Sequence, residues 1–181
     1  MTVKFLMAAF TVVFFLTGCG GSASKKGETE MPDFVLNPPQ EEGALYGSGV
    51  SEQSSEQLAK ETADARACKE IAATVGTRVS SVLKDFMGQA GISDTGAEIT
   101  EFVQSVTKSL TDIELTGCSV VKREQANGKL YSLAKYPLDP KAREMIKGVV
   151  KENLSSREAL LSSFRAQKGF EELEKELQNL Q

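Results

Sequence analysis

The residue best placed to do chemistry is Cys19. It directly follows Leu16-Thr17-Gly18, at the end of a run over residues 5–16 that is apolar except for Thr11. The run has the length of a signal-peptide core and is shorter than the roughly 20 residues that cross a bilayer. Small residues suit a signal peptidase, and a cysteine thiol can carry diacylglycerol through a thioether. We therefore predict a lipobox rather than an ordinary secretory signal, with residues 1–18 removed and Cys19 as the lipidated N-terminus.

The lipid would be a sufficient membrane attachment. Cleavage exposes an amino group on Cys19 that can be acylated, for example with palmitate, and three acyl chains exceed the two signals that stable anchoring requires. Gly20 follows the cysteine, where an aspartate commonly retains a lipoprotein in the inner membrane of Gram-negative bacteria. The sequence therefore predicts a lipid-anchored envelope protein, most readily placed at the outer membrane, on either its periplasmic or its surface face.

Cys68 and Cys118 are the other two cysteines. An exported chain enters an oxidising compartment, where two thiols can pair. Cys68 falls on the apolar seam of a long predicted helix and has no neighbouring base that would make it a catalytic thiol. If Cys118 lies in a strand, its side chain points to the same face as that of Val120, and the side chain of Ile113 points to the opposite face. A bulge near Gly117 would place all three on one face. A Cys68–Cys118 disulfide and buried free thiols both remain open.

Gly47-Ser48-Gly49 invites two chemical interpretations. A nucleophile elbow needs Gly-x-Ser-x-Gly, but Tyr46 stands where that pattern needs its first glycine, and the chain contains no histidine to activate the serine. A phosphate-binding turn needs a third glycine, and Glu52 stands in its place. We expect instead a strand whose glycines let another backbone approach closely.

The remaining charges indicate surface rather than sites. The chain has 21 Lys and Arg, 25 Asp and Glu, no histidine and a net charge of −4. A mixed, acidic surface argues against nucleic acid as a partner, and histidine, the commonest zinc ligand and general base, is missing. A calcium site needs a loop with carbonyl ligands. The acidic cluster near the end has a helical pattern instead, so we expect a solvated face at Glu171, Glu172, Glu174 and Glu176. We expect no catalytic residue, metal or cofactor.

The elements that would position these residues begin with a tether over residues 19–42, where glycines, serines and prolines oppose regular structure. Residues 44–50 read as a short strand. Ser54 with Gln57 forms a capping-box pattern that opens a long amphipathic helix. Its small and apolar residues recur along one seam, at Leu58, Ala65, Cys68, Ile71, Ala72, Val75, Val79, Val82 and Phe86.

The second half of the chain continues with a glycine-rich turn over residues 88–96 and a shorter helix capped by Thr95. Residues 113–125 and 130–138 read as two strands of a hairpin, because Asn127-Gly128 favours a type I′ turn. Asp139-Pro140 is typical of a helix start, and Ser155 with Glu158 indicates a restart. The last helix carries an apolar stripe at Ala166, Phe170, Leu173, Leu177 and Leu180.

This order predicts an α+β fold in which a small, mainly antiparallel sheet packs on a long helix. The elements are a strand, a long helix, a short helix, a β-hairpin and a helix, followed by a C-terminal helical extension. We divide the chain into a signal peptide (1–18), a lipidated N-terminus and tether (19–42), a folded domain (43–152) and a C-terminal helix (153–181).

Three motifs behind the lipobox resemble those of a known family. Tyr46-Gly47-Ser48-Gly49 precedes a helix containing Ala63-Asp64-Ala65-Arg66-Ala67, and the hairpin ends in Asn127-Gly128-Lys129-Leu130-Tyr131-Ser132-Leu133-Ala134. Together they resemble the Lpp-twenty family of twenty-kilodalton bacterial lipoproteins, over about residues 43–152. The resemblance implies a compact, broadly dodecin-like strand–helix–strand–strand unit, of a kind also found in periplasmic flagellar-ring components. It carries no catalytic residues to transfer, and the long C-terminal extension departs from it.

The sequence thus favours a non-enzymatic, membrane-anchored lipoprotein that acts by binding or assembly. One alternative is an accessory subunit of a flagellar or secretion complex. For such a subunit, the apolar stripe of residues 156–180 would dock a second copy of the chain or an envelope protein; the other expectation is that the stripe packs on its own domain. An envelope hydrolase is a weaker alternative, because it would need a cleft with perturbed carboxylates or an activated nucleophile.

Overall fold

The computed structural model describes residues 31–89, 96–112 and 116–180. Three antiparallel strands form one sheet in the order β1-β3-β2, with β1 over Ala44–Ser51, β2 over Ser119–Ala126 and β3 over Lys129–Pro137. The helices are α1 (Asp33–Leu36), α2 (Glu56–Gln89), α3 (Gly96–Asp112), α4 (Pro140–Ser155), α5 (Glu158–Ala166) and α6 (Gly169–Gln178). The expected α+β fold and the expected order of its elements are confirmed.

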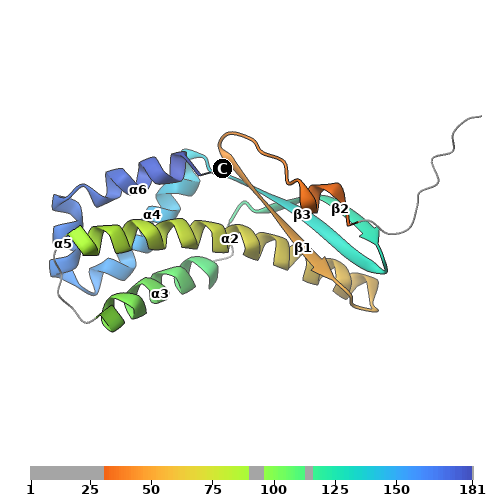
Figure 1. Ribbon diagram of the computed structural model, residues 1–181, viewed down its shortest axis with the longest axis horizontal. Helices are drawn as coiled ribbons and strands as arrows, with labels where there is room; N and C mark the ends of the chain where they lie inside the picture. Colours follow the sequence, from red (N-terminus) through yellow and green to blue (C-terminus); the bar gives the residue numbers. More distant parts are fainter. Residues whose placement is uncertain (1–30, 90–95, 113–115, 181) are drawn as a thin grey trace, which may run out of the picture.

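The molecule is elongated, with the sheet at one end and a helical bundle at the other (Figure 1). The long helix α2 runs through both ends. Its first half packs on β1 and β3, and its second half packs between α3 and α6. One core cluster therefore runs from Leu45 in β1 to Leu180 at the end of the described chain.

The close packing of α2 on the sheet depends on the two glycines of β1. A Cβ atom added to Gly49 would lie 2.0 Å from the carbonyl oxygen of Ala63, and one added to Gly47 would lie 2.5 Å from that of Ala67. Both distances are well below van der Waals contact. The expectation that Gly47-Ser48-Gly49 is a strand with a close backbone approach is confirmed.

Replacement of Gly49 by alanine is therefore expected to destabilise the protein by about 3 kcal/mol, because the new methyl group meets helix backbone that cannot move aside alone. Gly148 in α4 provides the matched control, since a Cβ there would meet no atom within 4 Å. Gly148→Ala should leave stability unchanged or raise it by up to about 1 kcal/mol through helix propensity. Urea unfolding of both variants measures the difference, and equal midpoints would contradict the packing.

The predicted seam of α2 is wrong over its first turns. Leu58 is 47% exposed, and Ala65 is also exposed. The residues buried there are instead Ala59, Ala63 and Ala67, which continue by the same spacing of four to the predicted Ile71. The close approach of α2 to Gly47 and Gly49 of β1 places Ala63 and Ala67 against the sheet, whereas the seven-residue repeat describes packing between two helices. From Ala72 to Phe86, where α2 packs on helices, the predicted positions are buried.

The hairpin of β2 and β3 forms as predicted, with positive φ at Asn127 (55°) and Gly128 (71°). The bulge lies between Val120 and Lys122, where the register shifts, and not at Gly117. It leaves Val121 52% exposed. The strand predicted over 113–125 begins only at Ser119, and residues 113–115 lie outside the described residues.

The predicted tether extends too far, because residues 32–42 are built onto the sheet. Phe34 of α1 is 5% exposed and packs with Tyr131 and Leu133 on the face of the sheet opposite α2. Glu41 forms an isolated bridge with Ala44. Residues 32–42 therefore form a strap across the outer face of the sheet, which the prolines in this region did not indicate.

The C-terminal helices complete the core of the helical end. Asp139 caps α4 by accepting a hydrogen bond from the Ala142 N–H, as predicted. The helix expected over residues 156–180 is instead two helices, broken at Gln167-Lys168, where Lys168 has a φ of 58°. The predicted capping box is wrong too, since the Ser155 hydroxyl donates to the Glu152 carbonyl and α5 has Arg157 as an N-cap without a side-chain bond.

The apolar stripe of this C-terminal segment packs on the parent domain, except for Ala166, which is exposed. Phe164, Leu173 and Leu177 are each no more than 1% exposed. Phe164 also makes edge-to-face contacts with Phe86 of α2 and Phe170 of α6, both at 4.8 Å between ring centres. Of the two expectations for this stripe, packing on the chain's own domain is the one that the structure shows.

Candidate functional site

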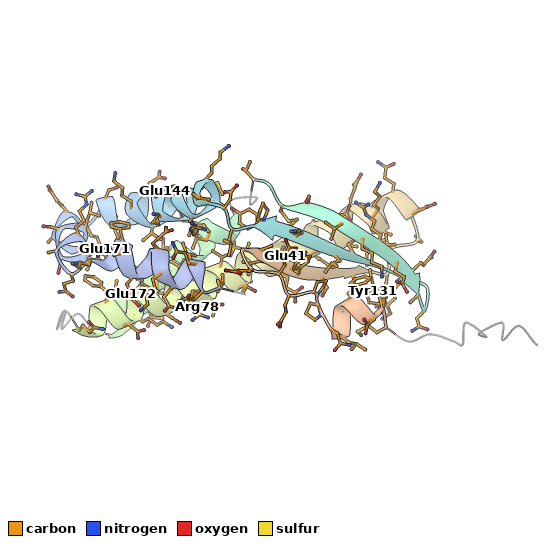
Figure 2. The ribbon with its side chains drawn as sticks, turned by 90° about the horizontal axis from the view of Figure 1, so that it is seen from above. Glu41, Arg78, Tyr131, Glu144, Glu171 and Glu172 are labelled. Carbon is orange, nitrogen blue, oxygen red and sulfur yellow. A yellow bond between two sulfur atoms is a disulfide. The ribbon has the colours of Figure 1, made fainter. Side chains whose placement is uncertain are left out.

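The main candidate, Cys19, lies outside the described residues, so its chemistry rests on the sequence. The other candidate residues fall within the described part of the chain. They gather in four places: at the contact of α2 with the sheet, on the outer face of the sheet, between α4 and α6, and in grooves between the helices. Figure 2 shows Glu41 and Tyr131 at the sheet end, and Glu144, Glu171 and Glu172 at the helical end.

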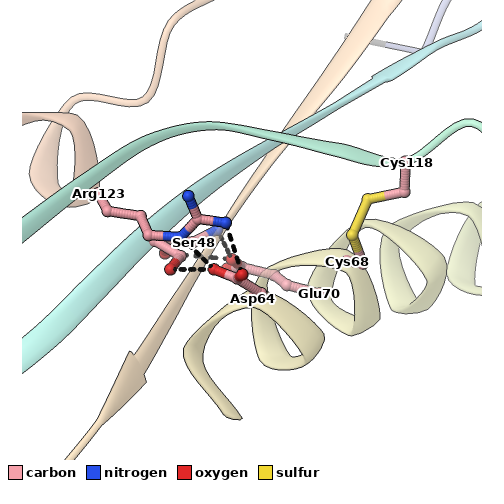
Figure 3. The surroundings of a disulfide bond; sticks show 7 residues. Ser48, Asp64, Cys68, Glu70, Cys118 and Arg123 are labelled. Atoms are coloured by element: carbon pink, nitrogen blue, oxygen red, sulfur yellow. Dashed lines mark hydrogen bonds and ion pairs between the residues drawn. A yellow bond between two sulfur atoms is a disulfide. The ribbon is translucent and has the colours of Figure 1, made fainter. Parts of the chain in front are cut away.

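A carboxylate of α2 is held in a polar bridge to the sheet (Figure 3). Asp64 accepts two hydrogen bonds from the Arg123 guanidinium, at 2.8 and 2.6 Å, and one from the Ser132 hydroxyl at 2.7 Å. Burial alone would raise the pKa of Asp64, but the hydrogen bonds from Arg123 and Ser132 outweigh it and lower the pKa. A general acid or base needs a pKa near the working pH. This carboxylate stays ionised and ties α2 to β2 and β3.

Ser48 lies in the middle of β1, and not on the strand-to-helix turn that a nucleophile elbow requires. Its N–H and its hydroxyl both donate to a carboxylate oxygen of Glu70, the hydroxyl at 3.1 Å. Nearby, Arg66 donates to the Val50 carbonyl at 2.6 Å. Side chains of α2 thus form hydrogen bonds with backbone groups of β1 that face away from β3. Because β1 is an edge strand, these bonds protect it from pairing with another chain.

Cys68 and Cys118 form a disulfide, with their Cα atoms 6.0 Å apart. It joins α2 to the residue just before β2, beside the Asp64–Arg123 bridge (Figure 3). The structure therefore holds the pair rather than two free thiols. A structural cross-link of this kind suits a protein that folds in an oxidising compartment.

The outer face of the sheet carries a second polar group beside the strap. Lys135 donates to both carboxylate oxygens of Glu41, at 2.8 and 2.6 Å, and the Tyr46 hydroxyl donates to the same carboxylate at 2.7 Å. These hydrogen bonds lower the pKa of Glu41 and raise that of Lys135. Lys122 lies over the Phe34 ring, 5.0 Å from its centre. The contacts fasten the strap at two points.

The acidic cluster of the last helix divides between surface and structure. Glu171 and Glu172 are exposed, as predicted, and pair within the helix with Lys168 and Lys175. Glu174 instead reaches α4, where Arg143 donates to its Oε1 at 2.7 Å and Lys147 lies 2.8 Å from its Oε2. The expectation of a solvated face is therefore wrong for Glu174, which joins α4 to α6, and for Glu176, which pairs with Arg78 of α2.

This ion cluster predicts an acid-sensitive contribution to stability. Burial would raise the pKa of Glu174, but Lys147, Arg143 and Gln178 outweigh it and lower the pKa from 4.5 to about 2. Because the folded pKa lies below the unfolded one, the stabilisation is complete above about pH 5 and is lost as the pH falls from about 4.5 to about 2. At pH 6 we expect Glu174→Gln to cost on the order of 2 kcal/mol, after discounting solvent screening.

The measurement is urea unfolding of wild type and variant between pH 6 and pH 2.5. The difference in free energy of unfolding between wild type and Glu174→Gln should become smaller as the pH falls. Glu171→Gln is the matched control, because Glu171 is 71% exposed in its ion pair with Lys168, and its curve should follow wild type throughout. If the difference in free energy of unfolding between wild type and Glu174→Gln did not change with pH, the lowered pKa of Glu174 would be contradicted.

Tyr136 is the polar side chain most deeply placed in the core. It is fully buried, and its hydroxyl has no hydrogen-bond partner among the described residues. Burial raises its pKa, so it is neutral at physiological pH. The hydroxyl lines none of the helical grooves described next, and we assign it no chemistry.

Grooves between the helices include three that are lined by described residues. The groove between α3 and α4 has a volume of about 760 Å³ and contains Arg157, which lies 5.0 Å from the Phe102 ring centre. A groove of about 730 Å³ lies between α2 and α6, where Arg78 pairs with Glu176 at 3.0 Å. The third, between α2 and α3, has a volume of about 470 Å³ and is lined by Lys69, Lys84 and Lys108.

Sequence reasoning missed these three lysines as a group. Lys69 and Lys84 are 15 positions apart on α2, and Lys108 belongs to a different helix, α3. The signal that the sequence offered was an outer face of α2 without a carboxylate at the positions facing α3. Within the described residues, no group of three or more cysteine or acidic side chains is arranged to hold a metal ion.

None of the helices among the described residues is long and apolar enough to cross a membrane. Comparisons of the chain with protein-family models, with curated proteins and with solved structures found no match.

Proposed function

We propose that this chain is a lipid-anchored protein of the bacterial cell envelope, similar to the Lpp-twenty lipoproteins, that acts by binding or assembly rather than by catalysis. The observation that carries the proposal is Leu16-Thr17-Gly18-Cys19 at the end of a short apolar run. The Cys68–Cys118 disulfide supports it, because such bonds persist in exported proteins. Gly20 favours sorting to the outer membrane.

The strap supports a defined placement of the body relative to the membrane. Twelve residue steps separate Cys19 from Met31, and a chain of that length spans at most about 43 Å in any conformation. The strap then fastens the chain to the outer face of the sheet through Phe34 and Glu41. The strap would therefore stay within that distance of the lipidated residue.

The surface that binds a partner is not the apolar stripe of residues 156–180. Its leucines at 173, 177 and 180 are at most 4% exposed within the chain's own core. We therefore place recognition on polar surface, and not on a C-terminal docking helix.

The test of the proposal is mass spectrometry of the N-terminal peptide after expression of the full chain in a Gram-negative host and extraction of the membranes. We expect Cys19 to be the first residue and to carry diacylglycerol and an acyl chain. Cys19→Ala should leave an unprocessed precursor, whereas changing Cys68 and Cys118 together to alanine should leave processing intact. Gly20→Asp should move the protein toward the inner-membrane fraction. An unmodified Cys19, or cleavage elsewhere, would contradict the proposal.

A further inference from the structure

The groove between α2 and α3 differs from the other two grooves in its charge. The α2–α6 groove contains the carboxylates of Asp85, Glu171, Glu172 and Glu176, and the α3–α4 groove contains those of Glu101 and Glu152. The described lining of the α2–α3 groove contains three lysines and no carboxylate. In a chain with a net charge of −4, this groove concentrates positive charge.

The three lysines are not neutralised by the described part of the protein. Lys69, Lys84 and Lys108 are all exposed, and none of the ion pairs of the described residues includes them. Nine other Lys and Arg residues do form such pairs, and the three lysines of this groove have no carboxylate among its described lining. Their potentials therefore add along the groove.

The described carboxylates that are nearest in sequence face other partners. Glu70, next to Lys69, accepts hydrogen bonds from Ser48 at the edge of the sheet. Asp85, next to Lys84, lines the groove toward α6, and Glu101 lines the groove toward α4. The fold thus turns these negative charges away from the lysines.

The lysines are spread along the groove. Lys69 and Lys84 are 15 positions apart on one helix, which is roughly 22 Å along its axis. Thr107 of α3 contacts Ser80 and lies against Gly76 of α2, so the neighbouring Lys108 falls between the other two. One phosphate group cannot reach cations spread over this length. A chain with repeated anionic groups can contact all three.

The floor of the groove offers oxygen lone pairs. The hydroxyl of Ser80 is within donating distance of the Gly76 carbonyl, that of Thr107 donates to Val103, and that of Thr111 donates to Thr107. Ser80 and Thr107 are also hydrogen-bonded to each other, so the hydrogens of this group point to backbone or to one another. The lone pairs that remain can accept hydrogen bonds from a ligand. Hydroxyl groups on the ligand would satisfy them, while its anionic groups meet the lysines.

We propose that the α2–α3 groove binds a linear polyanion whose repeating units carry a phosphate or carboxylate together with hydroxyl groups, as in anionic glycans. The proposal names the class of partner for the binding role given above and rests on that role for its biological setting. Because the ammonium groups supply charge without fixed geometry, phosphate and carboxylate serve equally, and binding weakens steeply with salt.

The test uses the full chain purified in detergent and the carboxylate glycan polygalacturonate, with neutral dextran as the polymer control. Wild type should bind polygalacturonate and not dextran. Changing Lys69, Lys84 and Lys108 together to glutamine should weaken binding roughly tenfold or more, and should reduce the slope of log affinity against log salt by about two. The matched control changes Lys60, Lys141 and Lys151 to glutamine, which removes the same charge from exposed positions outside the groove, and should bind within about twofold of wild type.

Four results would overturn the proposal: no binding by wild type, equal losses in the two triple variants, full competition by inorganic phosphate at matched charge, or binding to vesicles of phosphatidylcholine and phosphatidylglycerol in place of the polymer. The third would indicate a single-anion site, and the fourth a membrane surface. Circular dichroism melting of both triple variants should match wild type. The binding assay does not depend on the modification of Cys19. A chain that is lipidated but does not bind the polymer would therefore contradict only this proposal, and a chain that binds but is not lipidated would contradict only the proposed lipoprotein function.

Discussion

Deletion of residues 156–181 should remove the cooperative unfolding of the helical end. The segment contributes five buried side chains to the core: Leu161, Phe164, Leu173, Leu177 and Leu180. Full burial of each contributes about 1.5–3 kcal/mol, so their combined loss is comparable to the roughly 5–15 kcal/mol that holds a typical domain folded. The deletion would also expose the apolar face of α2 around Phe86 to water. Thermal unfolding followed by circular dichroism should show a much lower or absent transition.

A point substitution tests the same packing in a chain that still folds. Leu177 is fully buried, whereas Leu58 is 47% exposed on α2. Leu177→Ala should cost about 3 kcal/mol through lost burial and the cavity left behind, and Leu58→Ala should change stability by less than about 0.5 kcal/mol. If the truncated protein melted unchanged while crosslinked complexes disappeared, the segment would be a dock for another protein, as the sequence alone also allowed.

Where the sequence predicted the fold well, the determining interactions are local. Asn127-Gly128 sets a type I′ turn because both positions need positive φ, and Asp139-Pro140 starts α4 because a side-chain acceptor meets the first free N–H groups. The glycines of β1 were understood correctly for a similar reason. A glycine in a strand already indicates that something approaches closely, even when its partner is unknown.

The sequence-based predictions are wrong where the structure of a segment depends on the element that it packs against. Alanines at positions 63 and 67 follow a different helical repeat from the alanine at position 65, and only the sheet under the first half of α2 selects 63 and 67 for burial. Residues 32–42 have the composition of a tether, yet Phe34 finds an apolar pocket on the outer face of the sheet. The break between α5 and α6 at Lys168 could not be predicted from the apolar stripe, because the spacing of the stripe continues across it.

The candidate sites divide in the same way. A lipobox is a contiguous motif, so the sequence alone suffices to propose it. The lysine groove depends on how α3 lies against α2, which places Lys108 between two lysines of another helix. The Cys68–Cys118 pair was left open because the strand parity around Cys118 was inconsistent. In the structure β2 begins only at Ser119, and its register shifts after Val120.

Loss of the Cys68–Cys118 disulfide should cost about 4 kcal/mol. The bond closes a loop between residues separated by 50 positions, and the chain-entropy treatment of a loop of that length gives about this value at 25 °C. The loop contains most of α2 and all of α3, so its closure restricts a large part of the unfolded chain. Changing both cysteines together to alanine should lower the urea midpoint without changing the folded-state circular dichroism spectrum.

Reduction of the wild-type protein should reproduce that shift, and the same reductant should leave the double alanine variant unchanged. This comparison separates the cross-link from the packing of the two half-buried side chains, because reduction keeps both sulfur atoms in place. Thiol counting in denaturant without reductant provides an independent check: none should react besides Cys19, if that thiol is not lipidated. Two further reactive thiols, or equal midpoints with and without reductant, would show that the bond does not form in the folded protein.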